Sequence, residues 1–425
     1  CRTASYDSIY AEALTYAVNG DVSKAQLAIS KALAIAVPSN HGSGGQYYDF
    51  RNVVPDVALV YDWCYDQLTV AQRQQMATWL MDRCDEVWPD TNPARSGGWA
   101  VEDGANNYFY GFLTSWIAAL AVHGDGTDTI TSGTPSCPNR ALYHINLGLS
   151  KFNNYTRPYT DGWGVGGAFW ESCNYDSVHH LQRILDAHFT AANEDLFNLP
   201  GFDFLHDSVL WRIHGTAPTM DHCFAFGDLP THSDPYLWEL DRERAQVLLN
   251  VLDSSTLRGY ANYWLDNITP NISEHDRNDA FEFLYYDEDA ARTNYKLTQP
   301  LWYFASGAGM YVRRTGWAAD ATYWGIWSGP FKQSHQCADV NGFLIWKGND
   351  YLAGNAVMWS TSGICNTTPY QNNFTLGSYE QNPQTPDATW PQEAGHVVKQ
   401  ENTSEYGYFA GWGAQAYVQD RSHGG

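Results

Sequence analysis

The hydrophobic pattern of this chain of 425 residues changes character near residue 305, and that change limits the folds it can adopt. Before residue 252, apolar residues recur at helical spacing in one segment after another. Beyond residue 305 the chain has short runs rich in Tyr, Trp, Val and Ile, separated by Gly, Asn and Asp, as β-strands have. Helices followed by strands predict an α+β protein, with a helical domain over 1–304 and an antiparallel sheet domain over 305–425.

Helical periodicity predicts a series of paired helices before that change. The expected helices cover 6–17, 22–37, 53–68, 70–87, 106–122, 140–155, 175–188, 203–213 and 236–252. Thr69 is followed three residues later by Gln72, the spacing of a capping box, so a helix should begin at residue 70. Helices of this length and spacing are typical of helical hairpins arranged around an axis.

The expected strands are shorter and lie in the second part of the chain. They cover 310–314, 322–327, 342–347 and 350–353. The segment from Lys347 to Asp350 contains Gly348 and Asn349, which suit the tight turn of a β-hairpin. From about residue 360 to residue 403 the chain is rich in Asn, Thr, Pro and Gln, which predicts long loops with short strands.

Charge and composition disfavour some partners and favour another. The chain carries 47 acidic and 24 basic residues, so we expect no nucleic acid partner, because nucleic acid recognition needs a basic surface. Densely sulphated polymers are disfavoured by the same net charge of −23. No apolar run approaches the roughly 20 residues of a membrane span, so we expect no membrane partner. The 18 Trp and 28 Tyr residues favour a carbohydrate cleft, where sugars stack on rings, although such residues also fill cores.

Glycosylation sequons indicate a secreted protein. N-linked glycans are predicted at Asn154, Asn267, Asn271, Asn366, Asn373 and Asn402. Eight cysteines suit an oxidising compartment, and Cys64 and Cys84, expected on neighbouring helices, could form a disulfide. The chain begins at Cys1 without a Met or a signal-like segment, and we interpret it as mature, trimmed or a fragment. We therefore expect an extracellular location.

The stretch from Tyr159 to Ala192 joins a Gly- and Trp-rich loop to a helix. Its four closely spaced glycines are Gly162, Gly164, Gly166 and Gly167. Glycine allows backbone conformations closed to other residues and lets a ligand approach the main chain. Helical spacing begins at Tyr175, and Asn174 could cap that helix. Tyr175 and Glu171 would then face a cleft, unless Tyr175 is an ordinary core aromatic.

Five segments together resemble one enzyme family. They are VYDWCYDQL at 60–68, GANNY at 104–108, the DG…E…Y pattern at 161–175, FGD at 226–228 and SHQCADVNGF at 334–343. In this order they resemble the heparinase II/III-like polysaccharide lyases and their alginate-lyase relatives. The resemblance implies an incomplete (α/α) toroid followed by an antiparallel β-sandwich. The family's β-domain is usually longer than the part that remains here, which implies that the sandwich is truncated.

Lyases of this family remove the proton beside a uronic acid carboxyl group and expel the 4-linked sugar by β-elimination. The site must neutralise the carboxylate, take a proton and donate one to the leaving oxygen. The resemblance implies that Asn107, at a helix N-terminus, neutralises the carboxylate. It implies that Tyr175 protonates the leaving oxygen and can also act as base. His335 would act as base or as a partner of the carboxylate, for which an imidazole is well suited.

Other residues near these motifs are predicted to bind the substrate. They are Asn106, Tyr108, Glu171, Arg157, Trp99 and Trp163. Glu171 could bind sugar hydroxyl groups or orient Tyr175. Asn106 is equally suited to capping a helix, and the arginine and the two tryptophans are equally suited to packing.

The chain departs from the family pattern at two kinds of position. Tyr108 stands where many relatives have His, so more of the base role falls on His335 and Tyr175. Cys337 stands where relatives often have a metal-binding His, and Asn355 stands where an Asp ligand is frequent. Cys337 and His396 could still hold a structural zinc or other divalent metal, but loss of the metal, with Cys337 buried or in a disulfide, is favoured. We expect no required cofactor.

The leading interpretation is a secreted polysaccharide lyase acting on a uronic acid polymer, with alginate or glucuronan favoured by the charge. A uronyl epimerase or a glycosaminoglycan lyase would use the same fold. An (α/α)-barrel glycoside hydrolase would instead need a carboxylate pair, such as Glu102 or Asp103 with Glu171. A non-catalytic carbohydrate-binding protein would explain the departures at Tyr108 and Cys337.

Overall fold

A computed structural model describes residues 4–38, 47–87, 115–126, 139–157, 165–168, 175–224, 237, 239–269, 283–330, 337–348, 350–354, 368–370, 372–374, 380–381 and 395–418. The chain divides into two compact units. Unit 1 comprises residues 1–156 and 180–196, and unit 2 comprises residues 157–179 and 197–425. Among the described helices, none combines the length and the apolar character that crossing a membrane requires.

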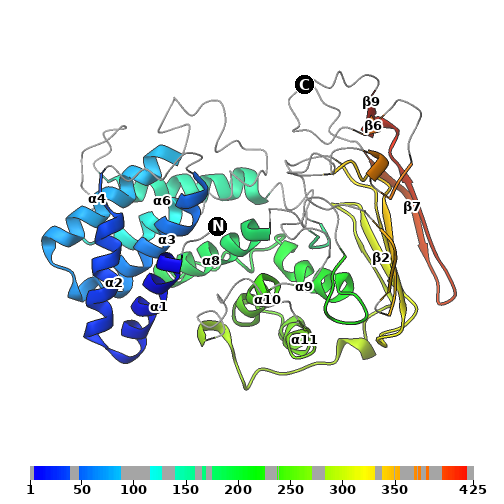
Figure 1. Cartoon of the computed structure of the whole chain (residues 1–425), viewed down its shortest axis with the longest axis horizontal. Helices are drawn as coiled ribbons and strands as arrows, with labels where there is room; N and C mark the ends of the chain where they lie inside the picture. Colours follow the sequence, from blue (N-terminus) through cyan, green and yellow to red (C-terminus); the bar gives the residue numbers. More distant parts are fainter. Residues whose placement is uncertain are drawn as a thin grey trace. The chain divides into compact units, whose positions relative to one another are not determined.

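The described part of unit 1 is helical, and helices that follow one another in the sequence pack against each other (Figure 1). Its elements are α1 (Ala4–Asn19), α2 (Val22–Ile35), α3 (Tyr47–Trp63), the short η1 (Tyr65–Gln67), α4 (Val70–Val87), α6 (Arg140–Lys151) and the π-helical turn η3 (Phe152–Thr156). Residues 115–122 are also helical. Helix α2 packs on α1, and α3 packs on α1, α2 and α4. These neighbouring helices confirm the predicted helical segments, while their arrangement as a toroid stays a prediction.

Local capping explains where two of these helices begin. The Asp21 side chain accepts hydrogen bonds from the backbone N–H groups of Ser23 and Lys24, directly before α2. The backbone N–H of Thr69 donates to Gln72 Oε1 at 2.8 Å, and the Gln72 N–H donates to Thr69 Oγ1 at 3.3 Å. The capping box predicted from the sequence is therefore confirmed, and it fixes the start of α4.

The disulfide considered between Cys64 and Cys84 is wrong, because both cysteines are free and buried. The Cys84 thiol donates to the backbone carbonyl of Ser115 at 3.4 Å instead. Burial raises the pKa of Cys64 to about 11, with a smaller contribution from Asp66. Both thiols thus behave as small apolar core groups.

The described residues of unit 2 form helices and antiparallel strands. Its helical elements are α9 (Phe204–Gly215), α10 (Glu239–Val251), α11 (Ser255–Leu265), η4 (Tyr295–Leu297), η6 (Thr368–Tyr370) and η7 (Ala414–Ala416). Its largest sheet has the order β1 (Trp302–Ala305), β2 (Met310–Arg314), β3 (Thr322–Trp327), β4 (Phe343–Lys347) and β5 (Asp350–Ala353). Two further pairs are β6 (Glu380–Gln381) with β9 (Tyr417–Val418) and β7 (His396–Asn402) with β8 (Gly407–Trp412).

These strands confirm the predicted change from helices to strands and the α+β class. The four expected strands are present as β2 to β5, with β4 beginning one residue later than predicted. Gly348 has φ 55° in the turn between β4 and β5, as the hairpin prediction requires. Helix α11 and strands β1 and β8 were not expected, while β7 lies in the region 360–403 for which short strands are predicted. The division into domains at residue 305 stays a prediction.

The five-stranded sheet is covered on both faces (Figure 1). On the inner face, Gly325 of β3 leaves room for the ring of Phe224, and a Cβ there would lie 2.0 Å from a ring carbon. On the outer face, Phe409 of β8 packs with Tyr311 of β2, their ring centroids 5.6 Å apart. The β7–β8 hairpin therefore forms the layer on the side of the sheet away from α9.

A buried cation joins β2 to the C-terminal end of α9. Arg314 is 3% exposed, and its Nη2 donates to the carbonyl oxygens of His214 at 2.7 Å and Thr216 at 2.8 Å. The guanidinium carbon also lies 4.2 Å from the centre of the Trp317 ring. The negative end of a helix dipole and an aromatic face both stabilise a cation. Burial lowers the pKa of Arg314 to about 10, so the side chain stays charged near neutral pH.

Replacing Arg314 with Met should lower the free energy of unfolding by about 3 kcal/mol, because two buried carbonyl groups lose their donor. Denaturant unfolding of the purified variant would measure this loss. Arg313→Met is the matched control on the opposite face of the sheet. Arg313 is half-buried and bonds Asn402 Oδ1 at 3.1 Å and the Thr403 carbonyl at 2.9 Å, so its loss should cost about 1 kcal/mol. Equal losses in the two variants would contradict the special role of Arg314.

Candidate functional site

The glycine-rich loop that is predicted to border a cleft belongs to unit 2. Two other segments of unit 2, α9 and the turn after β1, form hydrogen bonds with it. Asp207 Oδ2, in the first turn of α9, accepts a hydrogen bond from the Gly166 N–H at 3.1 Å. The Gly307 N–H, in the turn after β1, donates to the Val165 carbonyl at 2.9 Å. Four residues of the loop, 165–168, are described, and they connect α9 to the start of the sheet.

Two of the glycines are required by neighbouring protein backbone. Gly166 has φ 88° and Gly167 has φ 71°, in the left-handed region that favours glycine. A Cβ on Gly166 would lie 2.4 Å from Ala305 Cα, and a Cβ on Gly167 would lie 2.1 Å from the backbone carbon of Asp207. At these two positions the close approach is therefore to α9 and β1, whereas the sequence interpretation had assigned it to a ligand.

Burial changes the acidity of the groups beside this loop. It raises the pKa of Asp207, while the hydrogen bond from the Gly166 N–H acts in the opposite direction. Burial also raises the pKa of Tyr303 on β1, and the negative charge of Asp207 adds to that effect. The half-buried Asp207 carboxylate satisfies the Gly166 N–H and thereby ties the loop to α9.

Helix α8 (Tyr175–Ala192) begins at the residue that the sequence predicts. The chain thus passes from the clamped loop at 165–168, through the segment that contains Glu171, to a helix whose first residue is Tyr175. The side-chain position of Tyr175 lies outside what the structure describes. Tyr175 is the first residue of α8, which agrees with the predicted transition from loop to helix.

Most of the other predicted site residues lie outside the described residues. These are Trp99, Asn106, Asn107, Tyr108, Trp163, Glu171 and His335. The convergence of Asn107, Tyr175 and His335 on one sugar therefore stays a prediction. The carboxylates considered for a hydrolase, Glu102 and Asp103, also lie outside the described residues.

Arg157 follows directly after the π-helical turn η3, and its side chain is half-buried. Its Nη2 donates to the carbonyl oxygen of Pro200 at 3.4 Å. Turns of this kind are rare and often lie at functional sites. The hydrogen bond shows one packing contact of Arg157, and its role as a sugar contact stays a prediction.

The loop that follows His335 in the sequence is held tightly where it is described. Gln381 accepts a hydrogen bond from the Val340 N–H at 2.8 Å and donates to the Val340 carbonyl at 2.8 Å. Asn341 has φ 63°, a conformation that Asn adopts more readily than most residues. Asp339 is buried, and its backbone carbonyl accepts the Gly342 N–H at 2.7 Å. Hydrogen bonds therefore hold residues 337–342, which follow His335 in the sequence.

The zinc site considered at Cys337 and His396 does not fit the structure. Cys337 is buried and disulfide-bonded, so it has no free thiolate for a metal. His396 is on the surface at the start of β7, where its ring packs on Trp412 with centroids 4.9 Å apart. Among the described residues, no group of three or more His, Cys, Asp or Glu side chains could hold a metal.

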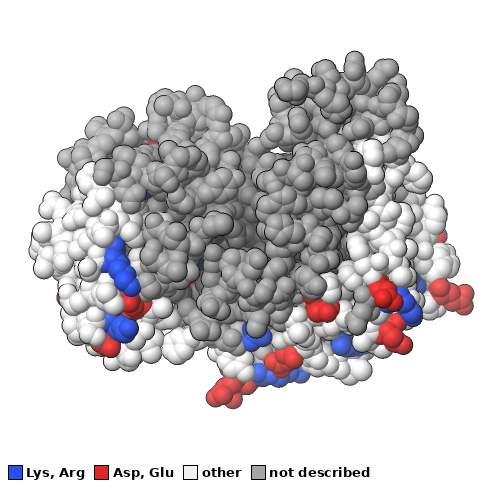
Figure 2. All heavy atoms as spheres, viewed as in Figure 1, with Lys and Arg blue, Asp and Glu red and all other residues white. Residues whose placement is uncertain are grey.

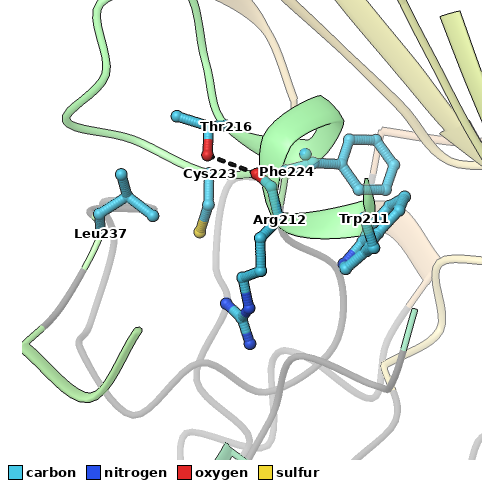
Figure 3. Close-up of a pocket in the computed structure, with 7 residues that line it drawn as sticks. Trp211, Arg212, Thr216, Cys223, Phe224 and Leu237 are labelled. Atoms are coloured by element: carbon cyan, nitrogen blue, oxygen red, sulfur yellow. Dashed lines mark hydrogen bonds between the residues drawn. The ribbon is translucent and has the colours of Figure 1, made fainter. Parts of the chain in front are cut away.

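A pocket that sequence reasoning missed lies at the end of α9 (Figure 3). It is lined by Trp211, Arg212, Gly215, Thr216, Cys223, Phe224 and Leu237, and its volume is about 190 Å³ including open solvent. Figure 3 shows the Arg212 side chain and the Cys223 sulfur pointing to the same side of the helix end. Drug-sized ligands usually occupy about 300–1,000 Å³, so this pocket is too small for a polysaccharide segment.

Several charged side chains on the described surface form pairs of opposite sign. Figure 2 shows acidic and basic side chains next to one another along its lower edge. Three such ion pairs are Lys31 with Glu12, Arg292 with Asp266, and Lys399 with Glu401. A pair of this kind leaves little net positive charge to attract a polyanion at a distance.

The structure was compared with solved protein structures, and heparinase III structures resemble it in fold. A crystal structure of heparinase III superposes with a TM-score of 0.55 and 13% sequence identity, over 92% of this chain and 56% of that chain. A second heparinase III, with methylated lysines, gives a TM-score of 0.55 and 12% identity over 95% of this chain and 58% of that chain. The chain has a heparinase III-like fold. No protein-family model and no curated protein sequence matches it.

The heparinase III-like fold confirms the family resemblance at the level of architecture. The chain spans little more than half the length of those two structures. Identities of 12% and 13% show the fold alone, so catalytic roles must be argued from the residues.

Proposed function

We propose that this protein is a polysaccharide lyase that cleaves a uronic acid-containing polymer by β-elimination. The observation that carries the proposal is the heparinase III-like fold over more than nine-tenths of the chain. The motif residues predicted for that chemistry lie at 104–108, 161–175 and 334–343. The loop at 165–168, held by Asp207, precedes Tyr175 in the sequence, and Tyr175 is the first residue of α8.

In the proposed reaction, Asn107 donates a hydrogen bond to the uronate carboxyl group and withdraws charge from it. His335 or Tyr175 then takes the proton from C5, and the electron pair of the C5–H bond forms a C4–C5 double bond. The C4–O bond breaks, and Tyr175 protonates the departing oxygen. If His335 is the base, its proton returns through solvent to the Tyr175 phenolate after the elimination; if Tyr175 is the base, it passes the same proton to the departing oxygen. The products are an unsaturated sugar and a new hydroxyl end, so atoms and charge balance without a redox partner.

The substrate class has two candidates within this chemistry. The net charge of −23 and the surface ion pairs favour carboxylate-only polymers such as alginate or glucuronan. The two heparinase III structures favour a glycosaminoglycan lyase. Both readings share the proton abstraction and the elimination, and they differ in the pocket that holds the sugar.

We also infer that the helical elements form an incomplete (α/α) toroid and that the strands form part of a β-sandwich.

We also propose that the protein is secreted. Asn154 and Asn267 are exposed sequon residues that can carry glycans. Their Nδ2 atoms donate to Ser150 Oγ at 3.1 Å and to the Tyr263 carbonyl at 2.7 Å, as Asn373 Nδ2 donates to the Ala338 carbonyl at 2.7 Å.

The purified chain should produce ultraviolet absorbance from a C4–C5 double bond when incubated with at least one of alginate, glucuronan, hyaluronan and heparan sulfate. The expected order is alginate or glucuronan first. New reducing ends without absorbance would indicate hydrolysis. Deuterium uptake from solvent without cleavage would indicate an epimerase. Binding without any chemical change would contradict the lyase assignment and leave a carbohydrate-binding protein.

A further inference from the structure

The β7–β8 hairpin presents a row of aromatic side chains to solvent on the face away from the five-stranded sheet. Its inward residues are already used, because Phe409 packs on Tyr311 and the ring of Phe304 lies 6.4 Å from that of Phe409. Alternation along β8 then turns Tyr408 and Trp412 outward. Tyr408 is 47% exposed and Trp412 is 38% exposed.

The register of the hairpin completes this outer face. His396 pairs with Trp412, Lys399 with Ala410, and Glu401 with Tyr408. Tyr406, in the connecting turn, is 51% exposed, and its hydroxyl donates to Glu401 Oε2 at 3.3 Å. We call this set of outward residues, His396, Lys399, Glu401, Tyr406, Tyr408, Ala410 and Trp412, the hairpin face.

The chemistry of the hairpin face distinguishes it from an ordinary apolar patch. Tyr406, Tyr408 and Trp412 are exposed rings that carry a polar atom. Val398, at the register shift of β7, is also 61% exposed and is the apolar side chain beside them. The rings of Tyr408 and Trp412 stand four residues apart on one strand, about 13 Å at 3.3 Å per residue. Lys399 Nζ and Glu401 Oε1 are 2.7 Å apart, so hydrogen-bonding groups lie beside the rings.

An extended sugar chain matches this pattern of rings and polar groups. Sugar rings have apolar C–H faces that pack on aromatic rings and hydroxyl edges that need donors and acceptors. An apolar protein partner would leave the Lys399–Glu401 pair desolvated without new partners, at a cost that a wet sugar surface avoids. The ion pair also leaves the hairpin face with little net charge, in a chain whose total is −23, so an acidic polymer meets little repulsion there.

We propose that the hairpin face is an accessory binding surface for the polysaccharide substrate. This proposal depends on the proposed function in one respect, the identity of the polymer. We take that polymer to be the uronic acid polymer that the active site cleaves. Such a surface adds a second point of attachment to a long chain, so it raises the apparent affinity for polymer and leaves short oligosaccharides unaffected.

The test compares Tyr408→Ala/Trp412→Ala with the wild-type chain in native gels that contain alginate, glucuronan, hyaluronan or heparan sulfate. The double variant should lose about tenfold in apparent affinity for the retarding polymer. Leu297→Ala is the matched control, because Leu297 is 81% exposed and belongs to η4, outside the hairpin face. Trp412→Phe, which keeps a ring, should retain most of the binding.

Turnover separates the two proposals. In the double variant the KM for polymer should rise while kcat and the rate on a short oligosaccharide stay at wild-type values. If no polymer is cleaved at all, the lyase assignment fails, yet gel retardation still tests the hairpin face. Unchanged retardation in the double variant would overturn the proposal. So would a wild-type dimer in light scattering that dissociates in the double variant, because the face would then bind a second copy of the chain. An unfolded double variant would be replaced by Tyr408→Ser alone, judged by the same retardation.

Discussion

Tyr175→Phe should reduce turnover of the uronate polymer about 1,000-fold, within the roughly 10²–10⁴-fold range of general acid–base catalysis. The substitution removes one hydroxyl group and leaves the aromatic ring, so α8 should still begin at residue 175. The departing sugar oxygen would have to leave as an alkoxide or take its proton from water. The initial rate of absorbance increase from the C4–C5 double bond is the measurement.

The reading of that result depends on a control for folding and for binding. Tyr286→Phe removes the same group from an exposed tyrosine whose hydroxyl accepts a hydrogen bond from Arg292, and it should keep the wild-type rate. Tyr175→Phe should also keep wild-type retardation in polymer-containing gels, because the hairpin face is intact. A Tyr175→Phe protein that turns over at more than a tenth of the wild-type rate would remove the phenol from the mechanism.

Much of the strand pattern could be predicted because local signals and tertiary structure agree there. Strands β2 to β5 are rich in aromatic and β-branched residues, and Gly348 marks the turn between the last two. Strand β7 lies among the short strands predicted between residues 360 and 403, but its bounds could not be predicted because Lys399, Gln400, Glu401 and Asn402 are poor strand formers. Its partner β8 and the contact of Asn402 with Arg313 hold it in place, and neither is visible in the local sequence.

Helix α11 shows the same limit for helices. Gly259 stands in its middle, where glycine weakens a helix by about 1 kcal/mol relative to Ala. The structure supplies the reason for that glycine, because a Cβ would lie 2.5 Å from Thr293 Oγ1. This long-range contact requires glycine at position 259, but the sequence around Gly259 gives no sign of it.

For the candidate site, the sequence indicates residue chemistry better than residue placement. The glycines at 166 and 167 signalled an unusual backbone, yet only the structure shows that α9 and β1 are what they approach. Asp207, which accepts the Gly166 N–H, carries no motif and was not expected. Residues as far apart in sequence as Asn107, Tyr175 and His335 can meet only through tertiary structure, so their convergence rests on the family resemblance.

Gly167→Ala should be among the most damaging single substitutions in unit 2. An added methyl group would lie 2.1 Å from the backbone carbon of Asp207 and 2.2 Å from the Ser208 nitrogen, and neither atom can move without shifting α9. The residue also has φ 71°, which costs a non-glycine residue roughly 1–3 kcal/mol. Overpacking adds roughly 1–3 kcal/mol. We therefore expect about 4 kcal/mol less free energy of unfolding.

Gly201→Ala separates the two contributions, because Gly201 has φ 78° but nothing within 4 Å of its added methyl group. That control should lose only the conformational part, roughly 1 kcal/mol. Denaturant unfolding of the two variants gives the difference directly. If Gly167→Ala remains folded at low temperature, it should also lose most of its turnover, because the loop that leads to Tyr175 cannot keep its position between α9 and β1. Similar losses in the two variants would mean that the backbone of Asp207 does not confine this loop.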